Sequence, residues 1–419
     1  MRDVLETFKK ITFIPHCSFK TKKLREFLVA ECQKAGAEVK VDEAGNILVT
    51  KGNPTICLQS HYDMVCVGDA PKIEVVEKDG YLMAKNSTLG ADNGIGVAMM
   101  LELLKQKQNI ELLFTNDEEV GLIGATNLNL PISSKYLLNL DSEEEGSICL
   151  GCAGGVDLFA TIKTSLIPHQ KQYSYEITTK NFKGGHSGVD IDKNIKNAIK
   201  ELAYFLKKAD CKIHSINGGE AGNAIPKSVK AIVMTNNKLK SNDFLEIKEI
   251  KKVDTILDKS DEVLDLLVSF PSGVRSYDKS LNLVQTSINL ATIKTTQDKV
   301  KLEISPRAMS DEELENLMLE SETHLRRFGF EVEFENRYPA WKPSIGEFAK
   351  KVQAISKKHF KNANFYAIHA GLECGVILKN SNLLEAVSIG PNIHNPHSID
   401  EKVELESIKK VYEVVKELV

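Results

Sequence analysis

The stretch at residues 110–121, IELLFTNDEEVG, is a short apolar segment that ends in three adjacent acids, Asp117, Glu118 and Glu119. The apolar segment predicts a strand, and α/β proteins bind their ligands beyond the carboxyl ends of strands. Two neighbouring glutamates can divide the labour, because one carboxylate can bind a metal while the other accepts a proton. Taken alone, the pattern is weak, and an acidic loop of this kind is more often a solvated turn.

A second apolar run, residues 55–60, predicts a buried parallel strand that delivers His61 and Asp63 at its carboxyl end. Residues two apart in an extended segment face the same way. His61 can therefore bind a metal while Asp63 fixes the tautomer and orientation of its ring. The alternative is a surface histidine beside an aspartate.

Asp92 lies in the glycine-rich segment STLGADNGIG, directly before an apolar helical pattern. This acid is either a helix N-cap or a carboxylate that bridges two cations. The glycine spacing differs from G-x-G-x-x-G, which argues against a dinucleotide loop. A third strand pattern, residues 136–140, ends in Asp141.

The repetition of strand, acid and helix predicts a doubly wound α/β domain whose ligands converge on one edge of the sheet. From about Val156 the pattern changes to a mixture of strands and helices, and after residues 339–343 the first pattern returns. We therefore expect a discontinuous catalytic domain, residues 1–155 and 341–419, around an inserted α+β domain at residues 156–340.

Ser398 and Glu401 have the spacing of a capping box, which predicts that the C-terminal helix opens there and runs through Leu418. His397 would then lie just ahead of a helix, where a ligand is held rigidly.

Composition narrows the class of protein. A chain of 419 residues suggests two domains, and its 42% hydrophobic and 27% charged residues are typical of globular proteins. The net charge of -4 gives no footprint for nucleic acid. The segment MRDVLETFKK lacks an apolar signal core, and no apolar run approaches a membrane span, so we expect a cytoplasmic location and no membrane partner. Eight scattered cysteines do not suggest a disulfide framework, and Cys149 and Cys152 are expected as thiols near a packed turn.

Two imidazoles and three carboxylates form the candidate ligand set: His61, Asp92, Glu119, Asp141 and His397. Nitrogen and oxygen ligands without a thiolate fit zinc, and manganese or cobalt also suits them. Five ligands exceed one tetrahedral site but suit two metals about 3.5–4 Å apart that share a carboxylate. Such a pair activates water and polarises a carbonyl, which predicts hydrolysis of an amide or ester.

Several motifs, in order along nearly the whole chain, carry a family resemblance: LQSHYDMV, STLGADNGIG, FTNDEEVG, LNLDSEEEG, GCAGG, GGHSGVDI, NAIP, HAGLECG and SIGPNIHNPHSIDE. The chain resembles the aminoacyl-histidine (Xaa-His) dipeptidases of peptidase D type. These belong to the co-catalytic zinc peptidases, together with carnosinases, tripeptidases, acylases and carboxypeptidase G. The resemblance implies a metallopeptidase that hydrolyses Xaa-His and related dipeptides with two divalent metal ions, foremost Zn²⁺.

The resemblance also implies the roles of the five ligands. Asp92 bridges the metals, His61 and Asp141 complete one site, and Glu119 and His397 complete the other.

Other residues receive roles from the same resemblance. Glu118 is the general base that takes a proton from the bridging water and delivers it to the leaving amine, and Asp63 orients the histidine ligand. In the insert, which resembles a lid and dimerisation domain, His186 stabilises the oxyanion. It reaches the partner's site in dimeric relatives, which implies a homodimer. Asn223 and Arg307 hold the substrate's C-terminal carboxylate, a task that suits an arginine fork.

The sequence leaves other interpretations open. Ser60 stands where relatives often carry glycine, which should alter packing and not chemistry. The chain is somewhat short for the group, with the loss expected in the lid, which leaves the preference for histidine open. A tripeptidase or an N-acyl amino acid amidohydrolase is the alternative among hydrolases. A non-catalytic metal-dependent binding protein is the alternative from another class, although an intact Glu118 argues against it. His369 is a candidate substrate contact or lid hinge, and Glu373 either binds a substrate amine or is a buried structural partner.

Overall fold

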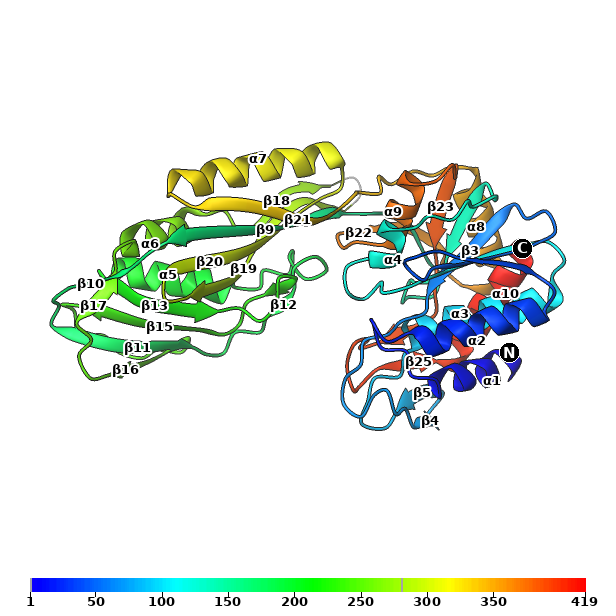
Figure 1. The fold of residues 1–419 in the computed structure, drawn as a ribbon, viewed down its shortest axis with the longest axis horizontal. Coiled ribbons are helices and arrows are strands. Elements are labelled where there is room, and N and C mark those ends of the chain that lie inside the picture. The colour runs from blue at the N-terminus through cyan, green and yellow to red at the C-terminus, as the bar shows by residue number, and fades with distance from the viewer. Residues whose placement is uncertain (1, 280–281) are drawn as a thin grey trace. The chain divides into compact units, whose positions relative to one another are not determined.

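The chain forms two compact units in the computed structural model, which describes residues 2–279 and 282–419 (Figure 1). The first unit contains the residues up to Cys152 together with Trp341–Ala367 and Leu372–Val419. The second unit contains Ala153–Ala340 and a short return, Ile368–Gly371. This return was not anticipated, because the sequence pattern placed all residues after 340 in one domain.

An eight-stranded sheet forms the centre of the first unit, in the order β1-β2-β6-β3-β7-β23-β8-β22. Its central strands are parallel neighbours: β6 (Ile110–Thr115), β3 (Ile56–His61), β7 (Tyr136–Asn139) and β23 (Glu385–Ser388). The outer strands are β1 (Glu38–Val41), β2 (Ile47–Lys51), β8 (Ser147–Cys152) and β22 (Asn364–Ile368). Every residue of β3 and β6 is buried, which confirms the predicted buried parallel strands and the α/β class.

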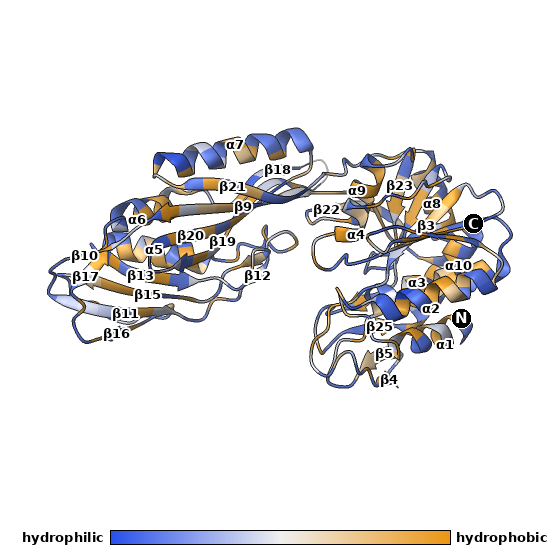
Figure 2. Ribbon diagram, viewed as in Figure 1, coloured by the Kyte–Doolittle hydropathy of each residue, from blue (hydrophilic) through white to orange (hydrophobic). Residues whose placement is uncertain are grey.

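Helices pack around this sheet: α1 (Arg2–Thr12), α2 (Lys22–Lys34), α3 (Ala91–Gln106), α4 (Ile123–Thr126), α8 (Glu347–His359), α9 (Glu373–Lys379) and α10 (Leu405–Leu418). α3 is buried over most of its length, as its apolar sequence requires, and the central strands are mainly hydrophobic (Figure 2). A smaller sheet completes the unit, in the order β24 (Ile393–His394), β25 (Lys402–Glu404), β5 (Tyr81–Ala84) and β4 (Val75–Lys78). Among the described residues, no helix is both long and apolar enough to cross a membrane.

The prediction for the start of the C-terminal helix was wrong. That helix, α10, begins at Leu405 after the short strand β25. Ser398 and Glu401 do not form a capping box. Ser398 Oγ donates to the carbonyl of Asn395, and the Glu401 carboxylate accepts backbone N–H groups near residue 90. His397 therefore lies in the loop between β24 and β25, not at a helix N-terminus.

The second unit is built on an antiparallel sheet in the order β16-β11-β15-β13-β19-β20-β9-β21, with β18 paired to β19. Its strands are β9 (Gly154–Lys163), β11 (Tyr173–Thr179), β13 (Lys212–Gly218), β15 (Val229–Thr235), β16 (Leu245–Glu249), β18 (Gly273–Asp278), β19 (Leu283–Thr295), β20 (Lys299–Ala308) and β21 (Glu331–Tyr338). Two further pairs are β10 (Leu166–Pro168) with β17 (Thr255–Leu257), and β12 (Gly185–His186) with β14 (Ala224–Ile225). The helices are α5 (Ala198–Lys208), α6 (Ser260–Ser269) and α7 (Asp311–Arg327), so this unit is α+β as expected.

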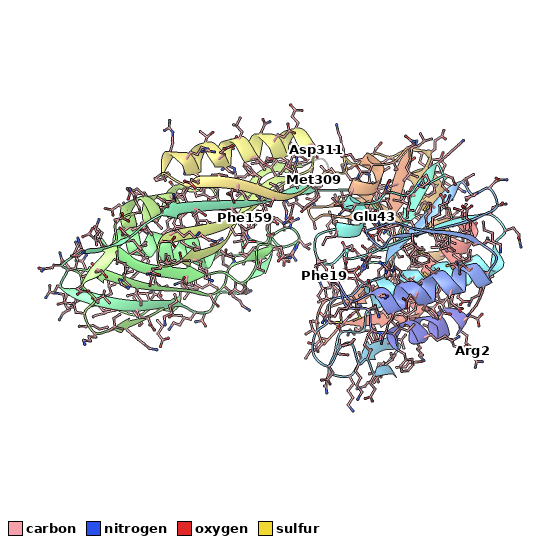
Figure 3. The ribbon with its side chains drawn as sticks, viewed as in Figure 1. Arg2, Phe19, Glu43, Phe159, Met309 and Asp311 are labelled. Carbon is pink, nitrogen blue, oxygen red and sulfur yellow. A yellow bond between two sulfur atoms is a disulfide. The ribbon has the colours of Figure 1, made fainter. Side chains whose placement is uncertain are left out.

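One disulfide joins Cys17 to Cys66 in the first unit. The spacing of the cysteines did not indicate this pair. Cys149 and Cys152 lie on β8 as buried thiols. Phe19, which is labelled in Figure 3, lies two residues after Cys17 and has an exposed side chain. Its backbone N–H donates to Asp117 Oδ1 at 2.6 Å, so the segment linked by the disulfide contacts the acidic loop after β6.

Candidate metal centre

The carboxyl ends of the parallel strands bring the candidate ligands to one edge of the first sheet. His61, the last residue of β3, is in register with Thr115, the last residue of β6. Glu119 follows β6 closely, and Asp141 lies two residues after β7. The strand ends therefore position these side chains as the sequence predicted.

Asp92 lies between the two imidazoles. Its Oδ1 is 3.0 Å from His61 Nε2, and its Oδ2 is 3.1 Å from His397 Nε2. His61 Nε2 is also 3.3 Å from Asp141 Oδ1, and His397 Nε2 is 2.8 Å from Glu119 Oε2. The five candidates thus form two triads that share Asp92, and the ligand atoms of each triad lie within 4.8 Å of one another.

Asp63 contacts both His61 and the acidic loop. The nearest contact of His61 Nδ1 is the main-chain carbonyl of Asp63 at 3.0 Å, and Asp63 Oδ1 is 3.5 Å from the same nitrogen. The Asp63 carboxylate also accepts the backbone N–H of Glu118 at 2.9 Å and the hydroxyl of Ser18 at 2.8 Å. Asp63 therefore positions the acidic loop as well as the histidine.

Asn93 was missed by the sequence reasoning. Its side-chain amide donates to the carbonyl of Leu140 at 3.0 Å and to Asp141 Oδ1, so it fixes one ligand from the helix that carries another. A Cβ at Gly96 would come within 2.1 Å of Asn93 Oδ1 and 2.3 Å of Ser60 Oγ. Gly96, the second glycine of ADNGIG, thus leaves the space that the Asn93 side chain occupies. This glycine was the one local feature of the sequence that could have drawn attention to Asn93.

The charge balance of the centre calls for cations. Burial opposes a charge on His61, yet the neighbouring carboxylates, foremost Asp141, hold its pKa well above its usual range. Burial also opposes a charge on His397, but Asp92 and Glu119 raise its pKa to about 11. Burial, together with the charge of Asp92, raises the pKa of Glu119 to about 7. The carboxylates thus favour protonated imidazoles, and a bound cation would balance the same negative charge in place of those protons.

A second observation fits a metal. The buried Oε1 of Glu119 has no hydrogen-bond partner among the residues that the structure describes. Buried polar atoms normally have a partner, and a bound cation would supply one. His397 is the most exposed of the five ligand candidates, with half of its side chain exposed, whereas the side chains of the other four are at most 11% exposed.

Glu118 and Glu373 are additional acids at the centre. Glu118 offers an oxygen within 4.8 Å of ligand atoms of His61 and Glu119. Burial and neighbouring acids hold the pKa of Glu118 well above its usual range. Glu373 is fully buried, and its Oε2 accepts hydrogen bonds from Gln59 at 2.5 Å and Thr115 at 2.8 Å. Burial raises the pKa of Glu373 to about 8.

The second unit brings its own candidates together. His186 lies on β12, which pairs with β14, and the N–H of Ser187 donates to the carbonyl of Asn223 at 2.7 Å. The Nδ1 of His186 accepts the backbone N–H groups of Gly188 and Val189 at 3.2 and 3.1 Å. In the neutral ring, an Nδ1 that accepts places the ring proton on Nε2, which makes Nε2 the donor of the ring.

Arg307 lies on β20 opposite Ser287 of β19, and its Nη1 donates to the hydroxyl of Tyr338 at 2.5 Å. His369 Nε2 is 2.8 Å from Ser287 Oγ. Burial and the charge of Arg307 lower the pKa of His369 to about 3, so this histidine is neutral. Nothing in the sequence indicated Tyr338 or Ser287, because only the folded unit brings Tyr338 to Arg307 and Ser287 to His369.

Known proteins resemble the chain over its whole length. The model of peptidase family M20/M25/M40 matches residues 57–419. The cytosol non-specific dipeptidase of Escherichia coli is 31% identical over 468 aligned positions, which cover 99% of this chain and 96% of that protein.

Solved structures give the same result. Aminoacylhistidine dipeptidase from Vibrio alginolyticus has 28% identity and a TM-score of 0.82, covering 99% of this chain and 95% of that one. A dinuclear metal-binding M20 peptidase from Bacillus subtilis shares the fold at a TM-score of 0.50 and 10% identity, covering 99% and 96%. These findings confirm the resemblance predicted from the motifs: the chain belongs to peptidase family M20/M25/M40 and is a metallopeptidase.

Proposed function

We propose that this metallopeptidase is a dipeptidase that uses two divalent cations, foremost Zn²⁺ with Mn²⁺ or Co²⁺ as alternatives. The observation that carries the proposal is Asp92, which directs one carboxylate oxygen to each imidazole. His61 and Asp141 would hold one cation with Asp92, and Glu119 and His397 would hold the other. When bound, the cations supply Lewis acidity to water and to the scissile carbonyl.

Glu118 moves the proton in this proposal. It accepts a proton from the attacking water and delivers it to the leaving amine. Its raised pKa makes the carboxylate a stronger base toward the proton of the water. Asp63 supports this role, since it holds the backbone N–H of Glu118.

The first unit is the catalytic domain in this proposal, and the second unit is a lid that also forms a homodimer. His186 donates from Nε2 to the developing oxyanion and acts in the partner subunit's site. This role is supported by the two backbone N–H groups that hold Nδ1 as an acceptor. Asn223 and Arg307 hold the C-terminal carboxylate of the substrate.

The substrates we propose are dipeptides, with Xaa-His dipeptides among them, and the proposed location is the cytoplasm. The E. coli relative is named a cytosol non-specific dipeptidase, and the Vibrio relative is named for aminoacylhistidine substrates. The E. coli name favours a broad preference, and the Vibrio name favours histidine at the second position. A tripeptidase or an N-acyl amino acid amidohydrolase is the alternative.

The test is a panel of substrates assayed with the metal-loaded protein: β-Ala-His, Gly-His, Leu-Gly, Leu-Gly-Gly and an N-acetyl amino acid. Turnover of the three dipeptides with little turnover of the last two compounds supports the proposal. A preference for Leu-Gly-Gly or the N-acetyl amino acid would replace the dipeptidase by one of the alternatives. Protein stripped with a chelator is the control, and it should be inactive on every compound.

A further inference from the structure

Glu401 is a buried acid, only 2% exposed, that binds the chain around a metal-ligand candidate. Its Oε2 accepts the backbone N–H groups of Leu89 and Gly90 at 2.7 and 3.0 Å. Its Oε1 accepts those of Ala91 and Asp92 at 2.8 and 3.3 Å. One carboxylate thus holds four successive amides that end at Asp92.

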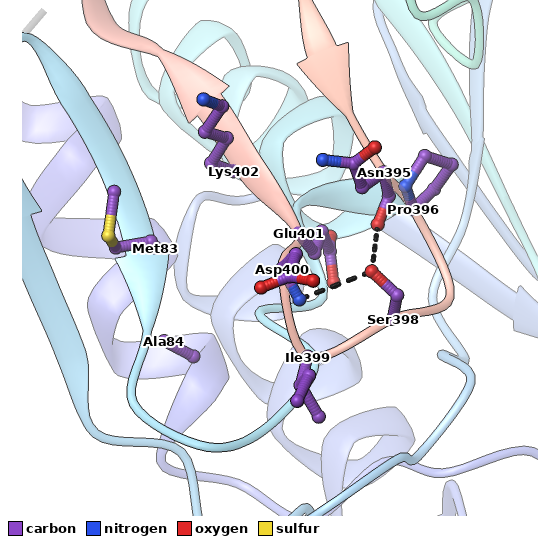
Figure 4. A pocket seen from close by; sticks show the side chains of 9 residues that line it. All are labelled: Met83, Ala84, Asn395, Pro396, Ser398, Ile399, Asp400, Glu401 and Lys402. Atoms are coloured by element: carbon purple, nitrogen blue, oxygen red, sulfur yellow. Dashed lines mark hydrogen bonds between the residues drawn. The ribbon is translucent and has the colours of Figure 1, made fainter.

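The same residue closes the loop that carries His397. The N–H of Glu401 donates to the carbonyl of Ser398 at 3.2 Å. Ser398 Oγ in turn donates to the carbonyl of Asn395 at 2.8 Å and accepts the N–H of Asp400 at 3.2 Å (Figure 4). These hydrogen bonds hold the loop between β24 and β25 together, and Glu401 connects this loop to residues 89–92.

His397 depends on that anchor for two reasons. Its backbone is left-handed, with a φ of 59°, a conformation that is unfavourable for a non-glycine residue and persists only when its surroundings impose it. The loop also lines an open pocket bordered by Met83 and Lys402, so packing does not support it on that side (Figure 4). Hydrogen bonds therefore carry much of the positioning.

We propose that Glu401 is a positioning residue that holds two ligand candidates, Asp92 and His397, at a fixed separation. The inference rests on the proposed function, because it concerns the cation that those residues would share with Glu119. Loss of the Glu401 carboxylate should weaken that cation more than the one at the other triad.

The selectivity follows from the separate anchors of the other triad. His61 Nδ1 is held by the carbonyl of Asp63 at 3.0 Å. The N–H of Asp141 donates to Asn139 Oδ1 at 3.1 Å, and its carboxylate is held by Asn93. Glu401 makes none of these contacts. In this triad only the shared Asp92 loses an anchor when the Glu401 carboxylate is removed, whereas the other triad loses the anchors of both Asp92 and His397.

The test measures cation binding and does not depend on turnover. Metal-stripped wild-type protein and Glu401→Gln are titrated with Zn²⁺ in the presence of a competing chelator, and with Co²⁺ while its visible absorption is followed. The Gln side chain keeps the size of Glu401 but directs a donor at amides that need an acceptor. Asp400→Asn is the matched control, because it removes a neighbouring exposed acid without removing a carboxylate acceptor of these amides.

We expect two binding steps in the wild type. In Glu401→Gln the dissociation constant of one step should rise about 10–100-fold, while the other changes about threefold or less. Asp400→Asn should leave both steps as in the wild type. Glu401→Asp, which keeps both oxygens on a shorter stem, should show the same one-sided weakening to a smaller degree, and it serves if the Gln variant does not fold.

Two results would overturn the inference. One is unchanged binding in both Glu401 variants, and the other is equal weakening of both steps. Each leaves the proposed function intact. A wild type that binds no second cation contradicts the proposed function itself.

Discussion

Replacing Glu118 by glutamine isolates its role as the proton acceptor. The amide has nearly the size of the carboxylate but cannot take up a proton at the working pH. The hydrogen bond that Glu118 makes to Asp63 Oδ1 uses the backbone N–H, so it survives the change. The two ligand triads do not include Glu118, so both cations should remain bound.

The size of the effect follows from what a positioned general base contributes. That contribution is about 10²–10⁴-fold, which corresponds to about 2.7–5.4 kcal/mol of activation free energy at 1.36 kcal/mol per tenfold change. We therefore expect a fall in kcat of about 10²–10⁴-fold with a small change in KM.

The assay is kcat on a dipeptide at saturating metal, with bound metal counted in the same samples. The pH profile provides a second readout, because a base must be deprotonated to act. Wild-type activity should fall as pH drops through the pKa of Glu118, and this acidic limb should be absent from the residual activity of Glu118→Gln. A kcat within tenfold of wild type, with two metals bound and the acidic limb intact, would refute the assignment.

Asp117→Asn is the matched control. It removes a negative charge from the adjacent residue, whose oxygens accept hydrogen bonds from Phe19 N–H at 2.6 Å and Asn116 Nδ2 at 2.8 Å. Asp117 belongs to neither ligand triad, so kcat should change about threefold or less, and a loss as large as that of Glu118→Gln would trace the effect to charge alone.

Two further changes test the surroundings of the site. Asp63→Asn should lower metal affinity about 10–100-fold, because its amide cannot accept both the Glu118 N–H and the Ser18 hydroxyl; unchanged affinity in a metal titration would contradict this. Glu373→Gln should alter the pH dependence of stability in the metal-free protein. Burial raises the pKa of Glu373 from 4.5 to about 8, so between these values the folded chain keeps a proton that the unfolded chain releases. The free energy of unfolding of the wild type should therefore fall, relative to Glu373→Gln, by about 1.4 kcal/mol per pH unit from pH 5 to 7.5. If urea unfolding gave the same change of this free energy per pH unit in both proteins, the assignment of Glu373 would be contradicted.

The ligand candidates were predictable because local pattern and tertiary structure agree for them. Each of His61, Glu119 and Asp141 follows an apolar run, and the carboxyl ends of parallel strands must meet at one edge of their sheet. The glycines around Asp92 likewise predicted a tight turn that leads into a helix.

Glu401 was misassigned because its local pattern has two meanings. Ser398 and Glu401 have the spacing of a capping box, but the amides that Glu401 binds belong to residues 89–92, about 310 positions earlier. Only the completed fold brings these segments together. Asn93 and the disulfide between Cys17 and Cys66 escaped prediction for the same reason, since their partners are distant in sequence.

The interrupted path of the central sheet determines the order in which the protein can mature. β23 lies beside β7, yet β7 ends at Asn139 and β23 begins at Glu385. At about 5–20 residues per second, a ribosome needs roughly 12–50 s to supply the missing strand. Throughout that interval one edge of β7 lacks its partner strand and is open to pairing with other chains, and the second unit, almost continuous in sequence, is synthesised in the same interval. This edge of β7 therefore stays unpaired until the segment that begins at Glu385 emerges, and the ligand candidate His397 leaves the ribosome only after β23.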